Sequence, residues 1–276
     1  MLIKLTLAAL CALMAAAALR FDPARPRTLV AERPAEGVRL RMLTWNVGYA
    51  ELEDDTRAHT KDLKAVAETI LKHDPDAVAL QELTGADQLN VLLAQLRGRY
   101  RGGVARAGGA DRVEAVLVKE AGARFEDVPA GGKYALGATF RPRPELPEVV
   151  LVSAHADAFN AARRRAYTEQ LSDWAAASRA GGRRVFIAGD FNFELDTRDR
   201  SHLYTDNLKH DSESYNRLLT FLRDLGREAG DTAVNDRRID YVFGPAEGAP
   251  LRRAEVLRGA AVGRMDHWPL LVEVTL

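Results

Sequence analysis

Residues 76–82 read Asp-Ala-Val-Ala-Leu-Gln-Glu: four consecutive apolar residues, Ala77 to Leu80, are followed directly by an amide and a carboxylic acid. A short apolar run of this length, ended by polar residues, is typical of a buried β-strand. Since the middle of such a strand lies inside the protein, the polar side chains that follow it lie at an edge of the sheet. The stretch therefore predicts a strand that carries Gln81 and Glu82 to the rim of a sheet.

Eight further apolar runs have the length of a strand. They predict strands over residues 40–47, 113–118, 135–140, 149–154, 185–188, 239–243, 251–257 and 270–276. Apolar residues at helical spacing predict three helices, over residues 63–71, 167–175 and 215–222. Thr84, with Asp87 three residues on, predicts a capped fourth helix that continues to Leu96.

The order of these elements indicates the fold class. Strands outnumber helices by about two to one, and short turns such as 119–134 and 141–148 join several neighbouring strands. A regular alternation of strand and helix is therefore excluded, and an α+β fold is favoured, with sheets packed on each other and helices outside. Residues 194–214 fit no element, and a polar stretch of this length is usually functional or mobile. We find no second linker, so we expect one domain over residues 38–276.

The first 18 residues differ from the rest of the chain. Lys4 is followed by an apolar run rich in Ala and Leu, which ends in the small residues Ala16 to Ala18. This is the pattern of a secretory signal peptide, so we expect residues 1–18 to be removed and the mature protein to be periplasmic or secreted, without stable membrane association. An uncleaved anchor is the alternative, because the run approaches the length of a bilayer span. Residues 19–37, rich in Pro, Arg and Ala, are expected to be a linker.

The charge balance restricts the partners. The chain of 276 residues has 39 basic and 39 acidic side chains, a formal net charge of zero. Because no strong overall field attracts a polyanion, any binding of nucleic acid has to rely on local patches. The proportions of hydrophobic residues (47%) and charged residues (28%) are ordinary for a soluble globular protein. Nothing in the sequence indicates an obligate protein partner.

Polar residues of the kinds used in catalysis stand at the ends of six predicted strands. They are Asn46, Glu82, His155, Asp190 with Asn192, Asp240, and Asp266 with His267. Each has an ordinary explanation when it is taken singly, because acids and amides are common in the turns that follow strands. Their repeated placement at strand ends predicts one site at the rim of a sheet sandwich.

These residues lie in short motifs whose order is informative. The motifs are 43–47 (LTWNV), 76–82 (DAVALQE), 153–155 (SAH), 189–192 (GDFN), 238–242 (RIDYV) and 266–269 (DHWP). In order and context they resemble the endonuclease/exonuclease/phosphatase superfamily, over residues 38–276. The resemblance implies a four-layer sandwich of two facing mixed β-sheets flanked by helices. It also implies hydrolysis of phosphate esters with Mg²⁺ or Mn²⁺, as in the nucleases, sphingomyelinases and inositol polyphosphate phosphatases of the superfamily.

The resemblance makes Glu82 the principal metal ligand, with Asn46 and Asp266 beside it. Mg²⁺ takes oxygen ligands and keeps several waters, so one or two carboxylates suffice to hold it. Position 48 is a glycine, where DNA-repair members carry a second acidic ligand. This difference argues against close kinship with the repair endonucleases.

The same resemblance assigns the catalytic residues. His267 takes a proton from the attacking water and is held by the carboxylate of Asp240, not by the adjacent Asp266. The remaining roles, positioning the water and hydrogen-bonding the phosphoryl oxygens, fall to Asp190, Asn192 and His155.

The sequence favours a nuclease or related phosphodiesterase that acts on a phosphate ester, nucleic acid included. Arg237 and Arg238 are the first choice for substrate contacts, because they directly precede Asp240 and because arginine suits bidentate phosphate binding. A phosphatase or phospholipase C-like enzyme, acting on small or lipid phosphates, is the alternative. A catalytically silent binding protein on the same scaffold is a more remote one.

Overall fold

The computed structural model describes residues 29–30, 37–48, 59–106, 112–197, 200–203, 207–260, 262–263 and 265–276. The predicted signal peptide, residues 1–18, lies outside the described residues. Of the predicted linker, residues 19–37, the structure describes residues 29–30 and Gly37. None of the described helices combines the length and the apolar character that a membrane span requires.

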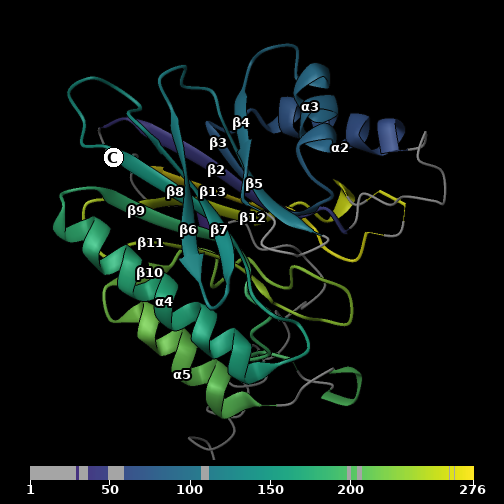
Figure 1. Cartoon of the computed structure of the whole chain (residues 1–276), viewed down its shortest axis with the longest axis vertical. Helices are drawn as coiled ribbons and strands as arrows, with labels where there is room; N and C mark the ends of the chain where they lie inside the picture. Colours follow the sequence, from purple (N-terminus) through teal and green to yellow (C-terminus); the bar gives the residue numbers. More distant parts are fainter. Residues whose placement is uncertain are drawn as a thin grey trace, which may run out of the picture.

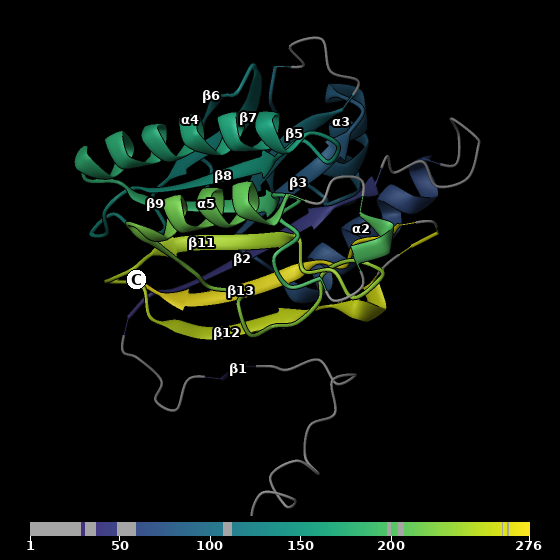
Figure 2. The same ribbon diagram turned by 90° about the horizontal axis from the view of Figure 1, so that it is seen from below.

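Two β-sheets face each other at the centre of the molecule (Figures 1 and 2). The first sheet has seven strands, in the spatial order β1 (Leu29–Val30), β12 (Leu251–Val256), β13 (Leu270–Thr275), β2 (Arg39–Asn46), β3 (Ala77–Leu83), β5 (Val113–Val118) and β4 (Arg101–Val104). The second has six, in the order β10 (Leu222–Asp224), β11 (Asp240–Pro245), β9 (Arg184–Asp190), β8 (Val149–His155), β7 (Lys133–Phe140) and β6 (Arg124–Ala130). Met42, Leu151 and Val242 belong to the apolar core between the sheets.

Helices cover the outer face of each sheet. The helical elements are α2 (His59–His73), α3 (Ala86–Gln95), α4 (Ala161–Ala180), α5 (Leu208–Leu219) and the 3₁₀ turns η2 (Arg200–His202) and η3 (Arg258–Ala260). Leu63 of α2 and Leu92 of α3 pack on the first sheet, whereas Leu171 of α4 and Leu218 of α5 pack on the second. Figure 1 shows the two helix pairs on opposite sides of the sheets. The predicted four-layer α+β sandwich is therefore confirmed.

Both sheets are mixed. Within the first sheet β2 and β3 run parallel, and within the second β8 and β9 run parallel. All the other strand pairs among the described residues are antiparallel. Each sheet therefore contains one place where two neighbouring strands end at the same edge.

Four strands were missed by the sequence prediction, and these four are the edge strands of the two sheets: β1, β4, β6 and β10. An edge strand has one side open, so it needs less apolar sequence than a central strand and shows no continuous apolar run. The segment 119–134, which was predicted to be a turn, contains β6. Residues 29–30, inside the predicted linker, pair with β12 as β1.

The segment 194–214 was predicted to have no regular structure, and this was wrong for its second half. Helix α5 begins at Leu208, with the Asn207 side chain as its N-cap, accepting a hydrogen bond from the His210 N–H. The predicted helix 215–222 covers only the end of α5 (Leu208–Leu219), and the pattern of its first turns is hidden because one buried position is Asp211, which pairs with the buried Arg164 of α4 at 2.9 Å. A buried ion pair here takes the place of an apolar contact between two helices.

The predicted cap of α3 was also wrong. The N-cap position is Gly85, which has no side chain that could cap the helix. Instead, the N–H of Thr84 donates to the side chain of Gln88, at 2.8 Å. An amide from inside the helix therefore satisfies the free N–H at its start.

Candidate active site

The predicted strand ends meet at one edge of the sandwich. In the parallel pair of the first sheet, Asn46 lies opposite Gln81, and in that of the second, His155 lies opposite Asp190. Strand β11 is antiparallel to β9 and starts with Asp240 opposite Asp190. Strand β13 starts at the same edge, three residues after His267. The topology of the two sheets therefore gathers side chains that are far apart in the sequence.

A glycine makes the close approach of β8 and β9 possible. Gly189 has a φ of 150°, a conformation that residues with a side chain rarely adopt. A Cβ atom at this position would lie 1.9 Å from the carbonyl oxygen of Ala154 on the neighbouring strand. Position 189 therefore accepts no side chain unless the two strands separate, and this fixes where Asp190 points.

Two of the predicted site residues have an unusual backbone conformation. The φ angle is 66° at Glu82 and 52° at Asn192, both in the left-handed region. The register of β3 and β5 shifts between Leu80 and Leu83, so Glu82 lies on a bulge, a feature that redirects a side chain. Non-glycine residues in such conformations cost about 1–3 kcal/mol and cluster at functional sites.

A histidine and an aspartate form a buried pair at the centre of the site. Nδ1 of His267 lies 2.8 Å from Oδ2 of Asp240. The neighbouring Asp266 lies 3.8 Å from the other ring nitrogen, Nε2, and its side chain is 55% exposed. The partner on Nδ1 is therefore Asp240, and Nε2 is the nitrogen that faces the open part of the site.

The backbone around this pair is held in place by two residues that the sequence prediction did not single out. The hydroxyl of Thr232 accepts hydrogen bonds from the N–H groups of Ile239 and Asp240, at 3.2 and 3.0 Å. The indole N–H of Trp45 donates to the carbonyl of His267, at 3.3 Å. Both residues are buried, so they fix the relative positions of two chain segments that are 27 residues apart.

Asp190 lies between the two histidines. Its Oδ1 accepts the N–H of Asn192 at 2.9 Å, and its Oδ2 accepts the amide of Asn46 at 3.0 Å. The same Oδ2 lies 3.7 Å from Nε2 of both His155 and His267. The side-chain amide of Asn192 donates to the carbonyl of Ala156, at 3.2 Å. The Gly-Asp-x-Asn turn therefore holds Asp190 rigidly at the point where the strand ends converge.

Burial and neighbouring charges change the proton affinities of this cluster. Burial alone would lower the pKa of His267, but the carboxylates of Asp240 and Asp190 raise it to about 10. Burial also raises the pKa of Asp190, with Asp240 adding to the increase and His267 opposing it. In this charge environment His267 retains its proton at neutral pH unless a further cation compensates the carboxylates.

The cluster has more acids than bases. In the part of the chain that the structure describes, four carboxylates have only two imidazoles as basic neighbours within ion-pair distance. The carboxylates belong to Glu82, Asp190, Asp240 and Asp266, and the imidazoles to His155 and His267. Even with both imidazoles protonated, the site carries excess negative charge. A hard divalent cation, which takes oxygen ligands, fits this excess.

The four carboxylates differ in their access to solvent. Asp190 and Asp240 are almost fully buried and engaged in hydrogen bonds, whereas the side chains of Glu82 and Asp266 are 17% and 55% exposed. Atoms of Asp190, Asp240 and His267 lie within 4.8 Å of one another and also form a possible ligand set. Because His267 and Asp240 already hydrogen-bond to each other, Glu82 is the better position for an ion that keeps part of its water shell.

The sequence of this chain matches the model of the endonuclease/exonuclease/phosphatase family over residues 43–263, well over half of its length. The chain belongs to the endonuclease/exonuclease/phosphatase family. The match includes the strand ends from Asn46 to Asp240 and stops before Asp266 and His267, whose place in the site comes from the geometry. No curated protein matches the chain in sequence.

Solved structures share the fold at low sequence identity. An endonuclease/exonuclease/phosphatase from Beutenbergia cavernae is 22% identical, with a TM-score of 0.65 over 86% of this chain and 72% of that one. The human Nocturnin catalytic domain with a bound sulfate anion is 19% identical, with a TM-score of 0.60 over 86% and 94% of the two chains. A mannosyl-6-phosphatase from Bacteroides thetaiotaomicron is 17% identical, with a TM-score of 0.63 over 86% and 100%.

Asn46, which was predicted to be a metal ligand, hydrogen-bonds to two acids of the site. Its amide NH₂ donates to Glu82 and to Asp190, both at 3.0 Å, and its oxygen accepts the N–H of Gly48 at 2.9 Å. The amide oxygen is the atom that would bind a metal, and it is already engaged away from the carboxylates. In this arrangement Asn46 is a donor that orients two acids, and its role as a metal ligand stays a prediction.

The two arginines predicted to contact substrate are tied to acids of the protein. The guanidinium of Arg237 binds Glu194, with Nε 2.8 Å from Oε1. Arg238 is 6% exposed, donates to Asp196 and Asp224 at 2.7 Å, and lies over the ring of Tyr241. Arg238 in particular does not fit the predicted role, because its guanidinium is buried and paired with two carboxylates of the protein. These ion pairs hold the loop before β11, and thereby Asp240.

Two further polar residues within strands lie at the site, although the sequence analysis assigned neither of them a role there. Gln81 of β3 donates to the hydroxyl of Ser153 on β8, at 2.9 Å, and so links the two sheets beneath the catalytic edge. Glu114 of β5 is buried, which raises its pKa to about 7, and it interacts electrostatically with His155 and Glu82. An acid inside an apolar run such as 113–118 is a signal that could have been read from the sequence.

Proposed function

We propose that this member of the endonuclease/exonuclease/phosphatase family is a divalent-metal-dependent phosphoesterase, and specifically a nuclease or related phosphodiesterase. The observation that carries the proposal is the buried His267–Asp240 pair, with Nε2 of the histidine turned toward the edge where Asp190 lies. A buried imidazole oriented by a carboxylate is the arrangement that general-base catalysis needs. Family membership supports hydrolysis of a phosphate ester as the reaction.

In the proposed mechanism His267 removes a proton from the attacking water at Nε2, while the Asp240 carboxylate holds Nδ1 and stabilises the imidazolium that forms. Asp190 accepts a hydrogen bond from the water and aligns it. His155 and Asn192 contact the phosphoryl oxygens, on which negative charge increases in the transition state.

Glu82 would hold a divalent ion, which would supply positive charge for the phosphoryl oxygens and for the carboxylates. The same charge has a second effect on the protein. The carboxylates alone raise the pKa of His267 to about 10, which would leave it protonated and unable to act as a base. A nearby cation opposes this increase. The metal requirement and the base function of His267 are therefore linked in this proposal.

A phosphatase that acts on small phosphates is the second candidate. The similarity in fold to a mannosyl-6-phosphatase, which is matched over its whole chain, keeps this possibility open. We further propose that the protein works outside the cytoplasm, periplasmic or secreted, because residues 1–18 have the pattern of a signal peptide.

One set of assays tests the proposal. Purified protein is incubated with duplex DNA, single-stranded DNA, RNA, sphingomyelin, bis(4-nitrophenyl) phosphate and mannose 6-phosphate, each with Mg²⁺, with Mn²⁺ and with excess EDTA. We expect a phosphodiester to be cleaved, EDTA to abolish turnover and either metal to restore it. Full activity in excess EDTA would refute the metal requirement, and cleavage of mannose 6-phosphate alone would favour the phosphatase.

Two variants test whether the metal binds at Glu82. Glu82→Gln is expected to raise the Mg²⁺ concentration needed for half-maximal activity, because an amide replaces the charged ligand. Glu68→Gln is the matched control, since Glu68 is exposed on α2 and pairs only with Lys64 among the described residues. An equal effect of both substitutions would show that the metal does not bind at Glu82.

Asp190→Ala, which should stop hydrolysis and spare binding, separates an enzyme from a silent binding protein.

A further inference from the structure

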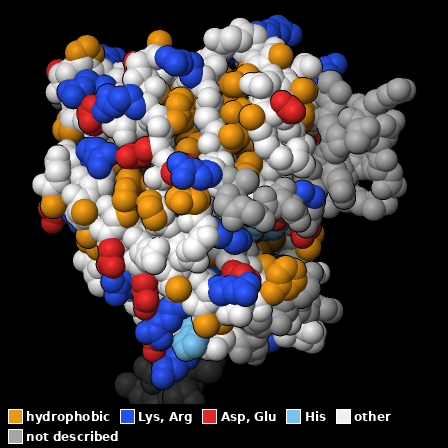
Figure 3. All heavy atoms as spheres, in the orientation of Figure 1, with side chains coloured by type: hydrophobic (Ala, Val, Ile, Leu, Met, Phe, Trp, Pro, Cys, Tyr) orange, Lys and Arg blue, Asp and Glu red, His pale blue; other side chains and the backbone are white. Residues whose placement is uncertain are grey.

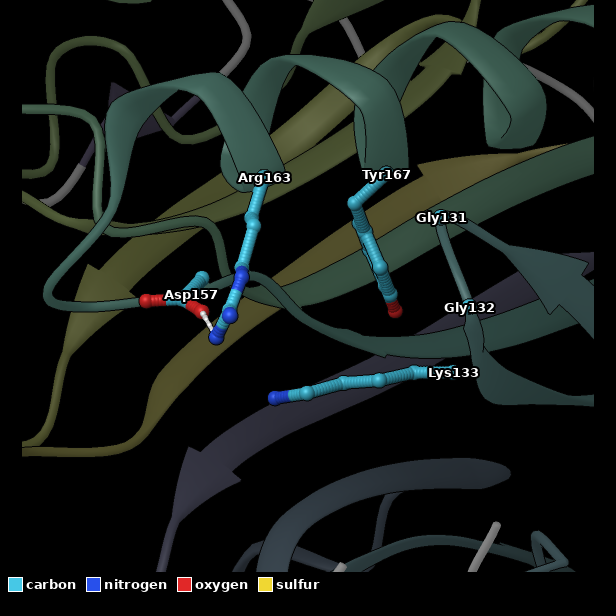
Figure 4. Close-up of a pocket in the computed structure, with 6 residues that line it drawn as sticks. All are labelled: Gly131, Gly132, Lys133, Asp157, Arg163 and Tyr167. Atoms are coloured by element: carbon cyan, nitrogen blue, oxygen red, sulfur yellow. Dashed lines mark ion pairs between the residues drawn. The ribbon is translucent and has the colours of Figure 1, made fainter.

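A cavity of about 200 Å³ lies beside helix α4, on the side of the second sheet (Figure 4). The turn between β6 and β7, the loop that follows β8 and the first turns of α4 line it, and it is open to solvent on one side. The residues that line it are Gly131, Gly132, Lys133, Asp157, Arg163 and Tyr167.

The wall of this cavity is fixed by glycine. Gly131 and Gly132, at the tip of the β6–β7 hairpin, have φ angles of 56° and 88°. A Cβ atom on Gly131 would lie 2.6 Å from the backbone nitrogen of Tyr167, so only glycine lets the hairpin rest against α4. The N–H of Gly131 also donates to the side chain of Gln170, at 2.9 Å. The turn and the helix are therefore held together in a fixed geometry.

The cavity is connected to the catalytic edge through one hydrogen bond. The hydroxyl of Tyr167, at the floor of the cavity, accepts the backbone N–H of His155 at 3.0 Å. The ring of the same histidine faces the site, with Nε2 3.7 Å from Glu82 and from Asp190. Tyr167 therefore both lines the cavity and contacts the residue whose ring lies beside the carboxylate cluster.

The lining of the cavity favours an anion. Among the lining residues, Lys133 and Arg163 contribute two positive charges against the one carboxylate of Asp157. A second carboxylate, the buried Glu114, does not line the cavity but interacts electrostatically with Lys133 and Tyr167. One oxygen of Asp157 accepts the N–H groups of Phe159 and Asn160, and the other lies 3.8 Å from the Arg163 guanidinium. Across the described part of the chain, no carboxylate lies within ion-pair distance of the Lys133 ammonium, whose side chain extends across the cavity toward Asp157 and Arg163 in Figure 4.

Tyr167 adds a neutral donor. Its side chain is buried, and burial raises its pKa well above the usual value, so the hydroxyl keeps its proton. The hydroxyl points into the cavity in Figure 4 and accepts a hydrogen bond from His155. Among the described residues no acceptor takes its hydrogen. An ammonium, a guanidinium and a hydroxyl therefore converge, which is a set of donors suited to phosphate oxygens.

We propose that this cavity binds a second phosphate group of the substrate, one that is not cleaved, while the first lies at the carboxylate edge. The inference rests on the proposed function, because it assigns a specificity subsite to that same reaction. The volume, about 200 Å³, is below the range of roughly 300–1,000 Å³ typical of drug-sized ligands and suits a single phosphate with a short stem.

Binding measurements test the subsite without requiring turnover. The His267→Ala protein is titrated calorimetrically, in the presence of Mg²⁺, with the dinucleotide TpT and with its forms phosphorylated at the 5′ end (pTpT) or 3′ end (TpTp). Glucose 1,6-bisphosphate is compared with glucose 6-phosphate in the same way. We expect a second phosphate to tighten binding about 10- to 100-fold in at least one series, the gain that charge-assisted hydrogen bonds give.

The matched variants are introduced into the same protein. Lys133→Met is expected to remove most of the gain, and Lys133→Arg to retain it. Lys64→Met, which removes one exposed lysine on α2, is expected to leave the gain unchanged. The series that shows the gain identifies the source as a nucleotide or a sugar phosphate.

Two results would overturn the inference: no gain from a second phosphate in either series, or an equal loss in Lys133→Met and Lys64→Met. If the proposed function is wrong, the experiments give a different result. The unsubstituted protein would then hydrolyse none of these compounds with Mg²⁺ or Mn²⁺, and a gain that depends on Lys133 would still support the anion subsite.

Discussion

The proposed mechanism makes His267 and Asp240 one functional unit, and this can be measured. We expect His267→Ala and Asp240→Ala each to reduce kcat severely, and the double variant to be little worse than the poorer single variant. The reason is geometric. Oδ2 of Asp240 hydrogen-bonds to Nδ1 of His267 at 2.8 Å, and Oδ1 has no hydrogen-bond partner among the described residues. Asp240 therefore acts on the reaction chiefly through the imidazole.

The size of the effect follows from this contact. Loss of a positioned base costs about 10²- to 10⁴-fold in rate. If each substitution costs about 10³-fold, two independent groups together would cost about 10⁶-fold. Because an unoriented imidazole has little left to lose, we expect the double variant to remain near 10³-fold. The difference corresponds to a coupling free energy of about 4 kcal/mol, since a factor of ten in rate is about 1.4 kcal/mol.

The assay is kcat on the best substrate of the panel, at saturating Mg²⁺, for the parent, both single variants and the double variant. Circular dichroism and the affinity for substrate, both expected to stay close to the parent's, check that the fold is intact. If the two losses in kcat multiply in the double variant, His267 and Asp240 do not act as one functional unit. A pH–rate profile of His267→Ala with an unchanged acidic limb would assign the base to another residue, with His155 as the next candidate.

Three further predictions concern the scaffold and the N-terminus. Gly189→Ala should lower the free energy of unfolding, measured by urea denaturation, by at least about 2 kcal/mol, because the new Cβ would lie 1.9 Å from a strand carbonyl oxygen. Gly85→Ala, at a similar φ but with no atom within 4 Å of the new Cβ, should lower it less. Arg164→Leu should cost about 3–5 kcal/mol by leaving Asp211 buried without its partner, and a Tm equal to the parent's would contradict this. Residues 1–18 should be absent on N-terminal sequencing of protein from the native host; retained Met1 in membrane material would favour an anchor.

The central strands were predictable because the information for them is local. Strands β2, β3, β8 and β9 are buried on both faces, so each appears in the sequence as an apolar run that needs no knowledge of its neighbours. The polar residue after each run then marks the edge of the sheet. For this reason the composition of the candidate site could be predicted although the topology that assembles it could not.

What the sequence did not predict depends on partners far away in the chain. Arg238 looks like a substrate contact because it precedes Asp240, but its acids, Asp196 and Asp224, are 42 and 14 residues away. The first turns of α5, before the predicted helix 215–222, are hidden because Asp211 is buried only through an arginine 47 residues earlier. In each case the burial of a charge is decided by tertiary pairing, which a single sequence does not display.

The balance of 39 basic and 39 acidic residues conceals a separation of charge around the site. At the catalytic edge four carboxylates face two imidazoles, whereas among the residues that line the cavity the cations Lys133 and Arg163 face one carboxylate, with the buried Glu114 behind Tyr167. A phosphate ester is repelled by the first region unless a cation lies there, and it is attracted by the second. Under the proposed function, the metal makes the edge accessible to the phosphate that is cleaved, while the cavity selects substrates with another phosphate nearby. A chain without net charge can therefore act on a polyanion through two local cationic positions, with no need for a basic surface.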